Sequence, residues 1–218
     1  MGASTDSPDD PDRILTVLDG PEVEEVVKGS RFLAQTFRVR SEDEALGRLD
    51  EIRSKYPDAT HHCWAARIGD PRRPVTRCDD DGEPNRTAGA PILLAIESAA
   101  VSDVLVIVTR YFGGTKLGKG GLVRAYGAAA RRALNDAPRS ETFRHVSVRI
   151  VVSYDDLGSV EGCLAKQARW IRDIDRTFES SPTLSFEVRR SRAESLRTEV
   201  REATSGRAEI EVRREEAT

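Results

Sequence analysis

A glycine-rich stretch is the first part of this sequence whose residue types indicate a chemistry. Residues 113–121 contain five glycines among nine residues, between an aliphatic run and a segment with helical spacing. Glycine lets a ligand approach the backbone closely, and free N–H groups at the start of a helix favour anions. The stretch therefore predicts contact with phosphate or with an RNA backbone. Its glycines are Gly113, Gly114, Gly118, Gly120 and Gly121, and the cationic residues in and around it are Arg110, Lys116, Lys119 and Arg124.

The same stretch partly fits a nucleotide-binding P-loop. Gly113–Lys119 satisfies the first part of that motif, but Gly120 stands where a serine or threonine hydroxyl would bind Mg²⁺. We therefore exclude a P-loop NTPase. A structural role stays open, in which the glycines permit a tight turn and close packing while the lysines are merely solvated.

An acidic run precedes this stretch in the chain. The carboxylates of Asp80, Asp81 and Glu83 could bind Mg²⁺ or Ca²⁺ through oxygen, although the spacing of an EF-hand is absent. The alternatives are a solvated turn, or a set of acidic partners for the cations named above. We expect the acidic run and residues 113–119 to border one cleft.

Aromatic residues near the glycines offer a second kind of nucleic-acid contact. They are Trp64, Tyr111, Phe112 and Tyr126. Unpaired bases stack on such rings while basic side chains follow the phosphates. The alternative is that these rings belong to the core.

The elements that must position these residues follow from hydrophobic spacing. Ser41 and Glu44 form a capping box, which predicts a helix that ends before Pro57. A second helix begins at Pro91, and a third follows Gly121. Residues 69–90 are predicted to be one long loop, and therefore a candidate site. Strands are predicted at residues 28–40, 60–68 and 104–108, the last with both faces covered.

A second domain is predicted after a linker at residues 139–145. Its order of strand, helix, strand, strand, helix and strand is that of the ferredoxin-like plait. Ser191 and Glu194 predict a capping box before its second helix. The predicted fold class is therefore α+β, with domains at residues 14–138 and 146–218. The six elements are 146–152, 156–169, 171–179, 183–189, 192–203 and 208–212.

The charge and the cysteine content of the chain argue against several classes of protein. The net charge of −3 argues against a strongly basic nucleic-acid binder, yet residues 110–139 hold seven basic residues against one aspartate. Residues 1–13 are predicted to form a disordered acidic leader. Three scattered cysteines do not make a disulfide framework, and no signal or membrane segment is apparent, so we expect a cytoplasmic protein.

Several motifs together make the sequence similar to a known family. Over roughly residues 28–134 the chain resembles the YigZ/IMPACT family, and its second half resembles the C-terminal domain of the bacterial YigZ branch. The motifs are residues 61–65, 80–84, 87–89 with 91–93, and 110–126. The resemblance implies an N-terminal domain of the ribosomal protein S5 domain 2-like type, related in shape to a domain of translocating elongation factors. It also implies a ferredoxin-like C-terminal domain.

The resemblance bears on function as well. Eukaryotic members regulate translation initiation by competing for a protein activator of a stress kinase, and bacterial members have been suggested to bind nucleic acid. Asn85-Arg86 stands where members tend to have Ser-Gly, and Ala90 where lysine is common, although Arg86 offsets the missing charge. The kinase-pathway role is not expected in a bacterial-type two-domain chain.

We therefore expect a non-enzymatic module that binds RNA, the ribosome or translation factors and modulates translation. It should have no DNA sequence specificity, no membrane partner and no cofactor. Two alternatives stay open: an enzyme that acts on a phosphorylated small molecule with Mg²⁺, and a protein-interaction adaptor. No catalytic residue is assigned. The predicted binding residues are Arg86 together with the glycines, cations, Tyr111 and Phe112 of the 110–124 segment, and the predicted opposite wall is Asp80, Asp81, Glu83 and Trp64.

Overall fold

The computed structural model describes residues 10–213, and their contacts divide the chain into two compact units. Of the described residues, the N-terminal unit comprises Ile14–Thr142, and the C-terminal unit comprises residues 10–13 and 143–213. The division falls inside the segment predicted to be a linker. That segment is not an irregular linker, however, because Arg139–Phe143 forms strand β7, which pairs with β1 (Arg13–Val17).

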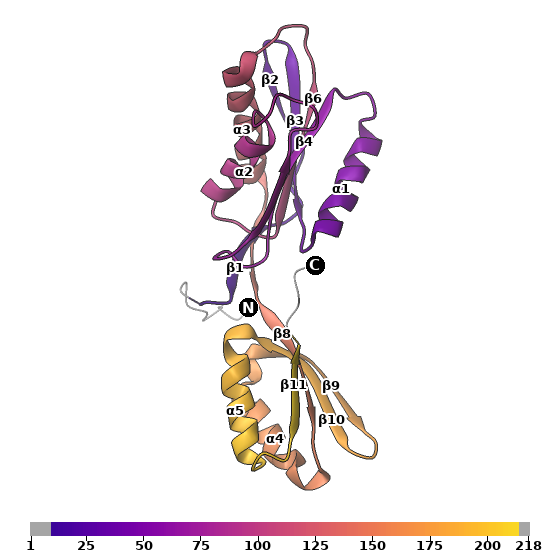
Figure 1. The fold of residues 1–218 in the computed structure, drawn as a ribbon, viewed down its shortest axis with the longest axis vertical. Coiled ribbons are helices and arrows are strands. Elements are labelled where there is room, and N and C mark those ends of the chain that lie inside the picture. Colours follow the sequence, from indigo (N-terminus) through magenta and orange to yellow (C-terminus); the bar gives the residue numbers. More distant parts are fainter. Residues whose placement is uncertain (1–9, 214–218) are drawn as a thin grey trace. The chain divides into compact units, whose positions relative to one another are not determined.

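The N-terminal unit is built on a five-stranded antiparallel sheet (Figure 1). The strand order is β2-β3-β6-β4-β5, so β6 lies at the centre. The aliphatic run of β6 is buried along its whole length, as predicted for a strand covered on both faces. The strands are β2 (Val23–Val27), β3 (Ser30–Arg38), β4 (His61–Ile68), β5 (Val75–Asp79) and β6 (Val104–Tyr111).

Three helices cover the two faces of this sheet, as Figure 1 shows. Helix α1 (Glu42–Lys55) packs on one face, and α2 (Gly89–Ser98) and α3 (Gly118–Asp136) pack on the other. Ser41 is confirmed as the N-cap of α1, since the Glu44 N–H donates to Ser41 Oγ at 3.1 Å, while the Glu44 carboxylate accepts from the Arg40 N–H at 2.7 Å. Because side chains alternate along a strand, β4 contributes residues to both hydrophobic cores.

The prediction of one long loop at residues 69–90 was wrong. Val75–Asp79 forms strand β5, which pairs antiparallel with β4 at the edge of the sheet. Its side chains are exposed or half-buried, so the five residues show little hydrophobic pattern. Only its hydrogen bonds to β4, the strand that precedes it in the chain, define β5 as a strand.

The C-terminal unit has the predicted order of elements. Its four strands form an antiparallel sheet in the order β11-β8-β10-β9, with α4 and α5 on one face (Figure 1). Short 3₁₀ turns, η1 (Ala168–Trp170) and η2 (Arg190–Arg192), adjoin the two helices. The bounds are β8 (His145–Val151), α4 (Tyr154–Lys166), β9 (Ile171–Phe178), β10 (Pro182–Arg189), α5 (Ala193–Ala203) and β11 (Glu209–Arg213).

Two predictions were wrong: the disorder of residues 10–13 and the capping of α5 by Ser191. Residues 10–13 are not disordered: Asp12 is 3% exposed, and Asp10 pairs with Arg189 at 2.6 Å. Residues 1–9 of the predicted leader lie outside the described residues. Ser191 does not cap α5 either, because α5 begins after Arg192 and the Ser191 N–H donates to the Asp12 carboxylate at 2.8 Å.

Among residues 10–213 there is no helix with both the length and the apolar character needed to cross a membrane.

Candidate functional site

The glycine-rich stretch is an exposed loop that runs into the start of α3. It leaves the end of β6 at Tyr111, and α3 begins at Gly118 with Leu117 as its N-cap. Residues 112–116 and 118–120 are exposed. The first N–H groups of a helix lack intrahelical acceptors, and no side chain caps this helix, so these amides can meet an anion.

The glycines of this loop have different structural roles. A Cβ at Gly113 would overlap the backbone of Gly29 in the β2–β3 turn, so Gly113 serves close packing. Gly114 and Gly118 have φ values of +85° and +69°, which L side chains rarely adopt. Gly120 is exposed and Gly121 partly so. The structural interpretation therefore explains Gly113, while the start of α3 remains open to solvent.

Hydrogen bonds hold the beginning of the loop in place. The Gly113 N–H donates to Ser30 Oγ at 3.1 Å, and the Phe112 N–H donates to Thr60 Oγ1 at 3.1 Å. The Phe112 side chain stays 48% exposed. An exposed ring therefore sits on an anchored backbone next to the glycines, where an unpaired base could stack on it.

Cationic side chains surround the start of α3. Lys116, Lys119 and Arg124 are exposed, and the described part of the chain shows no ion pair to any of them. Arg124 Nη1 lies 3.9 Å from the position that a Cβ would take at Gly120, so this guanidinium lies beside the first turn. Lys28 is exposed and lies next to the beginning of the glycine-rich loop, because its neighbour Gly29 packs against Gly113. Sequence reasoning missed Lys28, whose proximity depends on that contact between distant turns.

Arg110 does not belong to this exposed surface, contrary to prediction. Its side chain is buried and pairs with the buried carboxylate of Glu83. Tyr126 Oη donates to the same Glu83 oxygen at 2.8 Å, and Cys63 Sγ donates to Tyr126 Oη at 3.3 Å. Arg110 therefore neutralises a carboxylate in the interior and is not free to bind phosphate.

Burial controls the protonation of the other two members of this cluster. It raises the pKa of the Tyr126 hydroxyl and of the Cys63 thiol far above their ordinary values. Both groups are therefore neutral at physiological pH. A thiol that stays protonated is a poor nucleophile, so Cys63 acts as a buried polar contact.

The carboxylates of the acidic run make hydrogen bonds and ion pairs within the protein. Asp80 accepts hydrogen bonds from the Ala88 and Gly89 N–H groups, both at 2.9 Å, and so caps α2. Asp81 accepts from the His62 N–H at 2.6 Å and pairs with Arg53 at 3.0 Å. No group of three or more His, Cys, Asp or Glu side chains suited to a metal is found in residues 10–213. The three carboxylates thus serve three different structural contacts.

The expected arrangement around one open cleft is not what the structure shows. The acidic run and the segment before the glycines meet through the buried pair of Glu83 and Arg110. Trp64 packs on the α1 face of the sheet, whereas its neighbour Cys63 faces α2 and α3. Trp64 is therefore on the face opposite to α3, because adjacent residues of a strand point to opposite sides.

Tyr111 and Arg86 lie at the margin of the candidate site. Tyr111 is half-buried, and its hydroxyl donates to Asp58 at 3.0 Å. Arg86 is exposed with a φ of 62°, and its N–H donates to Asp80 at 2.7 Å. In the described residues no recorded contact joins either side chain to the start of α3.

The fold and the site define a two-unit α+β protein with an exposed cationic loop at the start of a helix in its N-terminal unit. Residues 28–134, which include the whole of that loop, match the family described as the Impact N-terminal domain. A relative from Bacillus subtilis, "IMPACT family member YvyE", is 33% identical over 198 residues, which are 90% of this chain and 89% of that protein. The chain belongs to the IMPACT family.

One further relative and one solved structure are also similar to this chain. A relative from Thermus thermophilus, "IMPACT family member in pol 5'region", is 48% identical over 139 residues, which are 64% of this chain and 74% of that protein. A solved structure described as "Crystal structure of an hypothetical protein" has a TM-score of 0.70 and 26% identity, and the match covers 94% of this chain and 99% of that one.

Proposed function

We propose that this protein is a non-enzymatic module that binds RNA of the translation apparatus through what we call the α3 N-terminal surface. This surface consists of Lys28, Phe112, Lys116, Lys119 and Arg124 with the backbone amides of the first turn of α3. The observation that carries the proposal is the gathering of exposed cations, for which the described residues provide no acidic partner, around uncapped helix amides.

Each part of this surface has a role in the proposed complex. The amide N–H groups at the start of α3 donate to a phosphate oxygen, and the lysines and Arg124 follow neighbouring phosphates. Phe112 offers a ring on which a base can stack whatever its identity. Such contacts favour RNA with unpaired nucleotides and give little sequence specificity.

The proposal extends to fold and location. The sheet orders support an S5 domain 2-like N-terminal unit and a ferredoxin-like C-terminal unit, as the family resemblance implies. Binding to ribosomes or translation factors would place the protein in the cytoplasm. The alternative of a Mg²⁺-dependent enzyme is less well supported, because Asp80, Asp81 and Glu83 are engaged in hydrogen bonds and ion pairs within the protein.

Salt-dependent binding of tRNA and of ribosomal RNA fragments tests the proposal. Affinity should fall steeply between low and moderate salt, because phosphate contacts release counterions. The double variant Lys119→Ala/Arg124→Ala should weaken binding of all these RNAs and lower the slope of log affinity against log salt by about two.

The matched control is Arg131→Ala/Arg132→Ala, which removes two exposed cations from the C-terminal half of the same helix. It should leave the affinity close to that of the wild type. Absence of RNA retention at low salt, or equal losses in both double variants, would contradict the proposal. Capture of a protein that resists nuclease treatment, without RNA binding, would favour the adaptor instead.

A further inference from the structure

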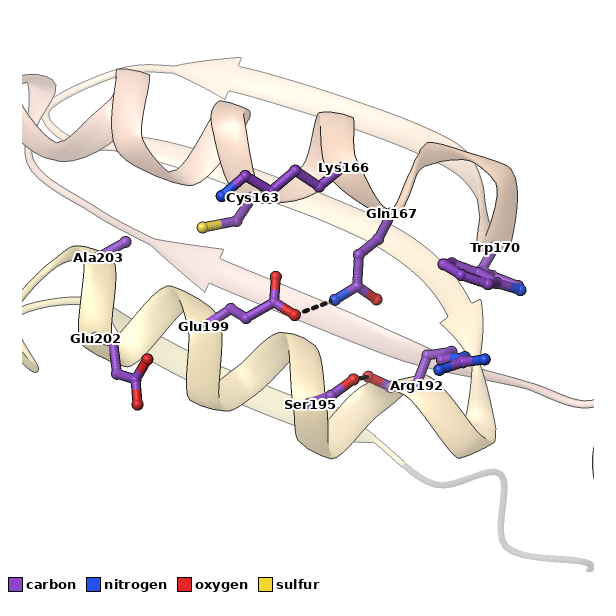
Figure 2. Close-up of a pocket in the computed structure, with 9 residues that line it drawn as sticks. All are labelled: Cys163, Lys166, Gln167, Trp170, Arg192, Ser195, Glu199, Glu202 and Ala203. Atoms are coloured by element: carbon purple, nitrogen blue, oxygen red, sulfur yellow. Dashed lines mark hydrogen bonds between the residues drawn. The ribbon is translucent and has the colours of Figure 1, made fainter.

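A polar groove between the two helices of the C-terminal unit is independent of the α3 N-terminal surface. This α4–α5 groove has a volume of about 790 Å³ and is drawn in Figure 2. Such a volume lies within the range of small-molecule sites, roughly 300–1,000 Å³. Its lining residues come from the end of α4, from η1, from the end of η2 and from one side of α5.

Gln167 supplies an unusual feature of this groove. It is only 6% exposed, and its Nε2 donates to Glu199 Oε1 at 2.7 Å across the two helices (Figure 2). Gln167 Oε1 is buried and has no hydrogen-bond partner in the described structure. Exchanging the positions of the Gln167 amide oxygen and nitrogen would not give the oxygen a partner, because the carboxylate of Glu199 can only accept hydrogen bonds. Buried polar atoms are nearly always paired, so Gln167 Oε1 calls for a donor.

Charged groups flank this acceptor. Lys166 and Arg192 line the groove, and in the part of the chain described neither forms an ion pair. The Arg192 guanidinium lies 4.3 Å from the centre of the Trp170 ring, which leaves its N–H groups free to bind an anion. The groove thus combines two acceptors, Gln167 and Glu199, with a cation on either side of them.

We infer that the α4–α5 groove binds a small zwitterion, of which a free α-amino acid is the simplest class. The ligand's ammonium group donates to Glu199 and to Gln167 Oε1, and its carboxylate meets Arg192. Because Gln167 Oε1 is shielded from solvent in this structure, binding requires the side chains around it to move. Lys166 adds a second positive charge, which disfavours ligands that are only cationic.

The two tryptophans of the chain provide the readout. Trp170 lines the groove, whereas Trp64 belongs to the N-terminal unit. In nuclear magnetic resonance spectra of the full ¹⁵N-labelled chain, titration with the common α-amino acids one at a time, up to about 10 mM, should shift the indole N–H signal of Trp170 for at least one of them. The Trp64 signal should stay in place. Cadaverine and glutarate, which each lack one of the two charges, should bind at least about tenfold more weakly.

Two variants connect the binding to the proposed contacts. Glu199→Gln keeps an oxygen that accepts from Gln167 Nε2 but removes the negative charge, and Arg192→Gln removes the anion partner. Each should weaken binding by about tenfold or more, the size of a lost charge-assisted hydrogen bond. Arg201→Gln, an exposed change on α5 outside the groove, should leave binding unchanged.

The inference is overturned if none of the amino acids moves the Trp170 signal, or if cadaverine or glutarate binds as tightly as the best amino acid. It is also overturned if binding survives both variants. If Glu199→Gln does not fold, the binding measured with Arg192→Gln tests the inference alone, because the Arg192 side chain is exposed and its replacement should leave the fold intact. Titration of Lys119→Ala/Arg124→Ala should give the wild-type result, which keeps this test separate from RNA binding.

Discussion

Arg110 and Glu83 form an ion pair in the interior of the N-terminal unit, where both side chains are almost completely shielded from water. Tyr126 from α3 donates to the same carboxylate, so strand β6, the acidic turn and helix α3 are joined at one point. This cluster holds the strand from which the glycine-rich loop departs. Its side chains are buried, so it positions the candidate site and is not part of the proposed α3 N-terminal surface.

Loss of one member of this pair should be strongly destabilising. Glu83→Ala leaves the Arg110 charge buried without its partner, and we expect a loss of about 3–5 kcal/mol in the free energy of unfolding. Chemical denaturation measures it. Glu24→Ala, which removes the partner of Arg31 in an exposed pair, should have a far smaller effect. Comparable losses in the two variants would show that burial does not set the energy of the Arg110 pair.

Gly113→Ala should damage both stability and RNA binding. A Cβ there overlaps the Gly29 backbone, so the loop or the β2–β3 turn must move. We expect a loss of about 1–3 kcal/mol, as for overpacking of a close contact, together with weaker RNA binding because Lys28 and the start of α3 separate. Thermal unfolding and RNA titration measure the two effects.

Gly47→Ala is the matched control for this substitution. Gly47 lies in α1, and a Cβ there meets nothing within 4 Å, so alanine should stabilise the helix by about 0.5–1 kcal/mol. A Gly113→Ala protein as stable as the wild type would mean that Gly113 and Gly29 are not in close contact in solution.

Asp80 should make the unfolding free energy depend on pH in the acidic range. Burial alone would raise the pKa of Asp80, but hydrogen bonds from the backbone N–H groups of residues 86–89 outweigh it and lower the pKa below the ordinary 3.8. The stabilisation is therefore fully present above that ordinary value, and it is lost as the pH falls through the lower folded-state value.

Asp80→Asn isolates this contribution. The variant should be less stable than the wild type at neutral pH by about 0.5–2 kcal/mol, the range for a lost helix cap, and the difference should shrink as the pH falls below 4. Urea unfolding at a series of pH values measures the trend. A difference that is constant across this range, or that grows toward low pH, would contradict the assignment of Asp80 as an ionised cap of α2.

Asp12→Ala should loosen the start of α5. The Ser191 N–H would lose its acceptor, and hydrogen exchange of the first amides of η2 and α5 should become faster. Asp12→Asn retains one acceptor oxygen and should show a smaller effect. Unchanged exchange in Asp12→Ala would mean that the contact between Asp12 and Ser191 does not stabilise this helix.

The backbone of the glycine-rich loop agrees with what the sequence predicts, for a physical reason. Five glycines between a strand and a helix indicate an unusual backbone, and the structure shows positive φ values at Gly114 and Gly118. Arg110 and Glu83 were predicted to belong to the candidate site because they are charged residues, but a residue's type does not show whether it is buried. A buried arginine and an exposed one look the same in a sequence, and only the packing of β6 against α3 distinguishes them.

Local periodicity was sufficient to predict most of the elements, because an amphipathic helix or a buried strand carries its pattern within its own residues. The Ser41 cap of α1, the central strand β6 and the order of the six C-terminal elements are of this kind. Contacts between residues distant in the chain were decided by the tertiary structure alone. They place Asp12 at Ser191 and bring Lys28 beside the glycine-rich loop, since each depends on how separate elements pack.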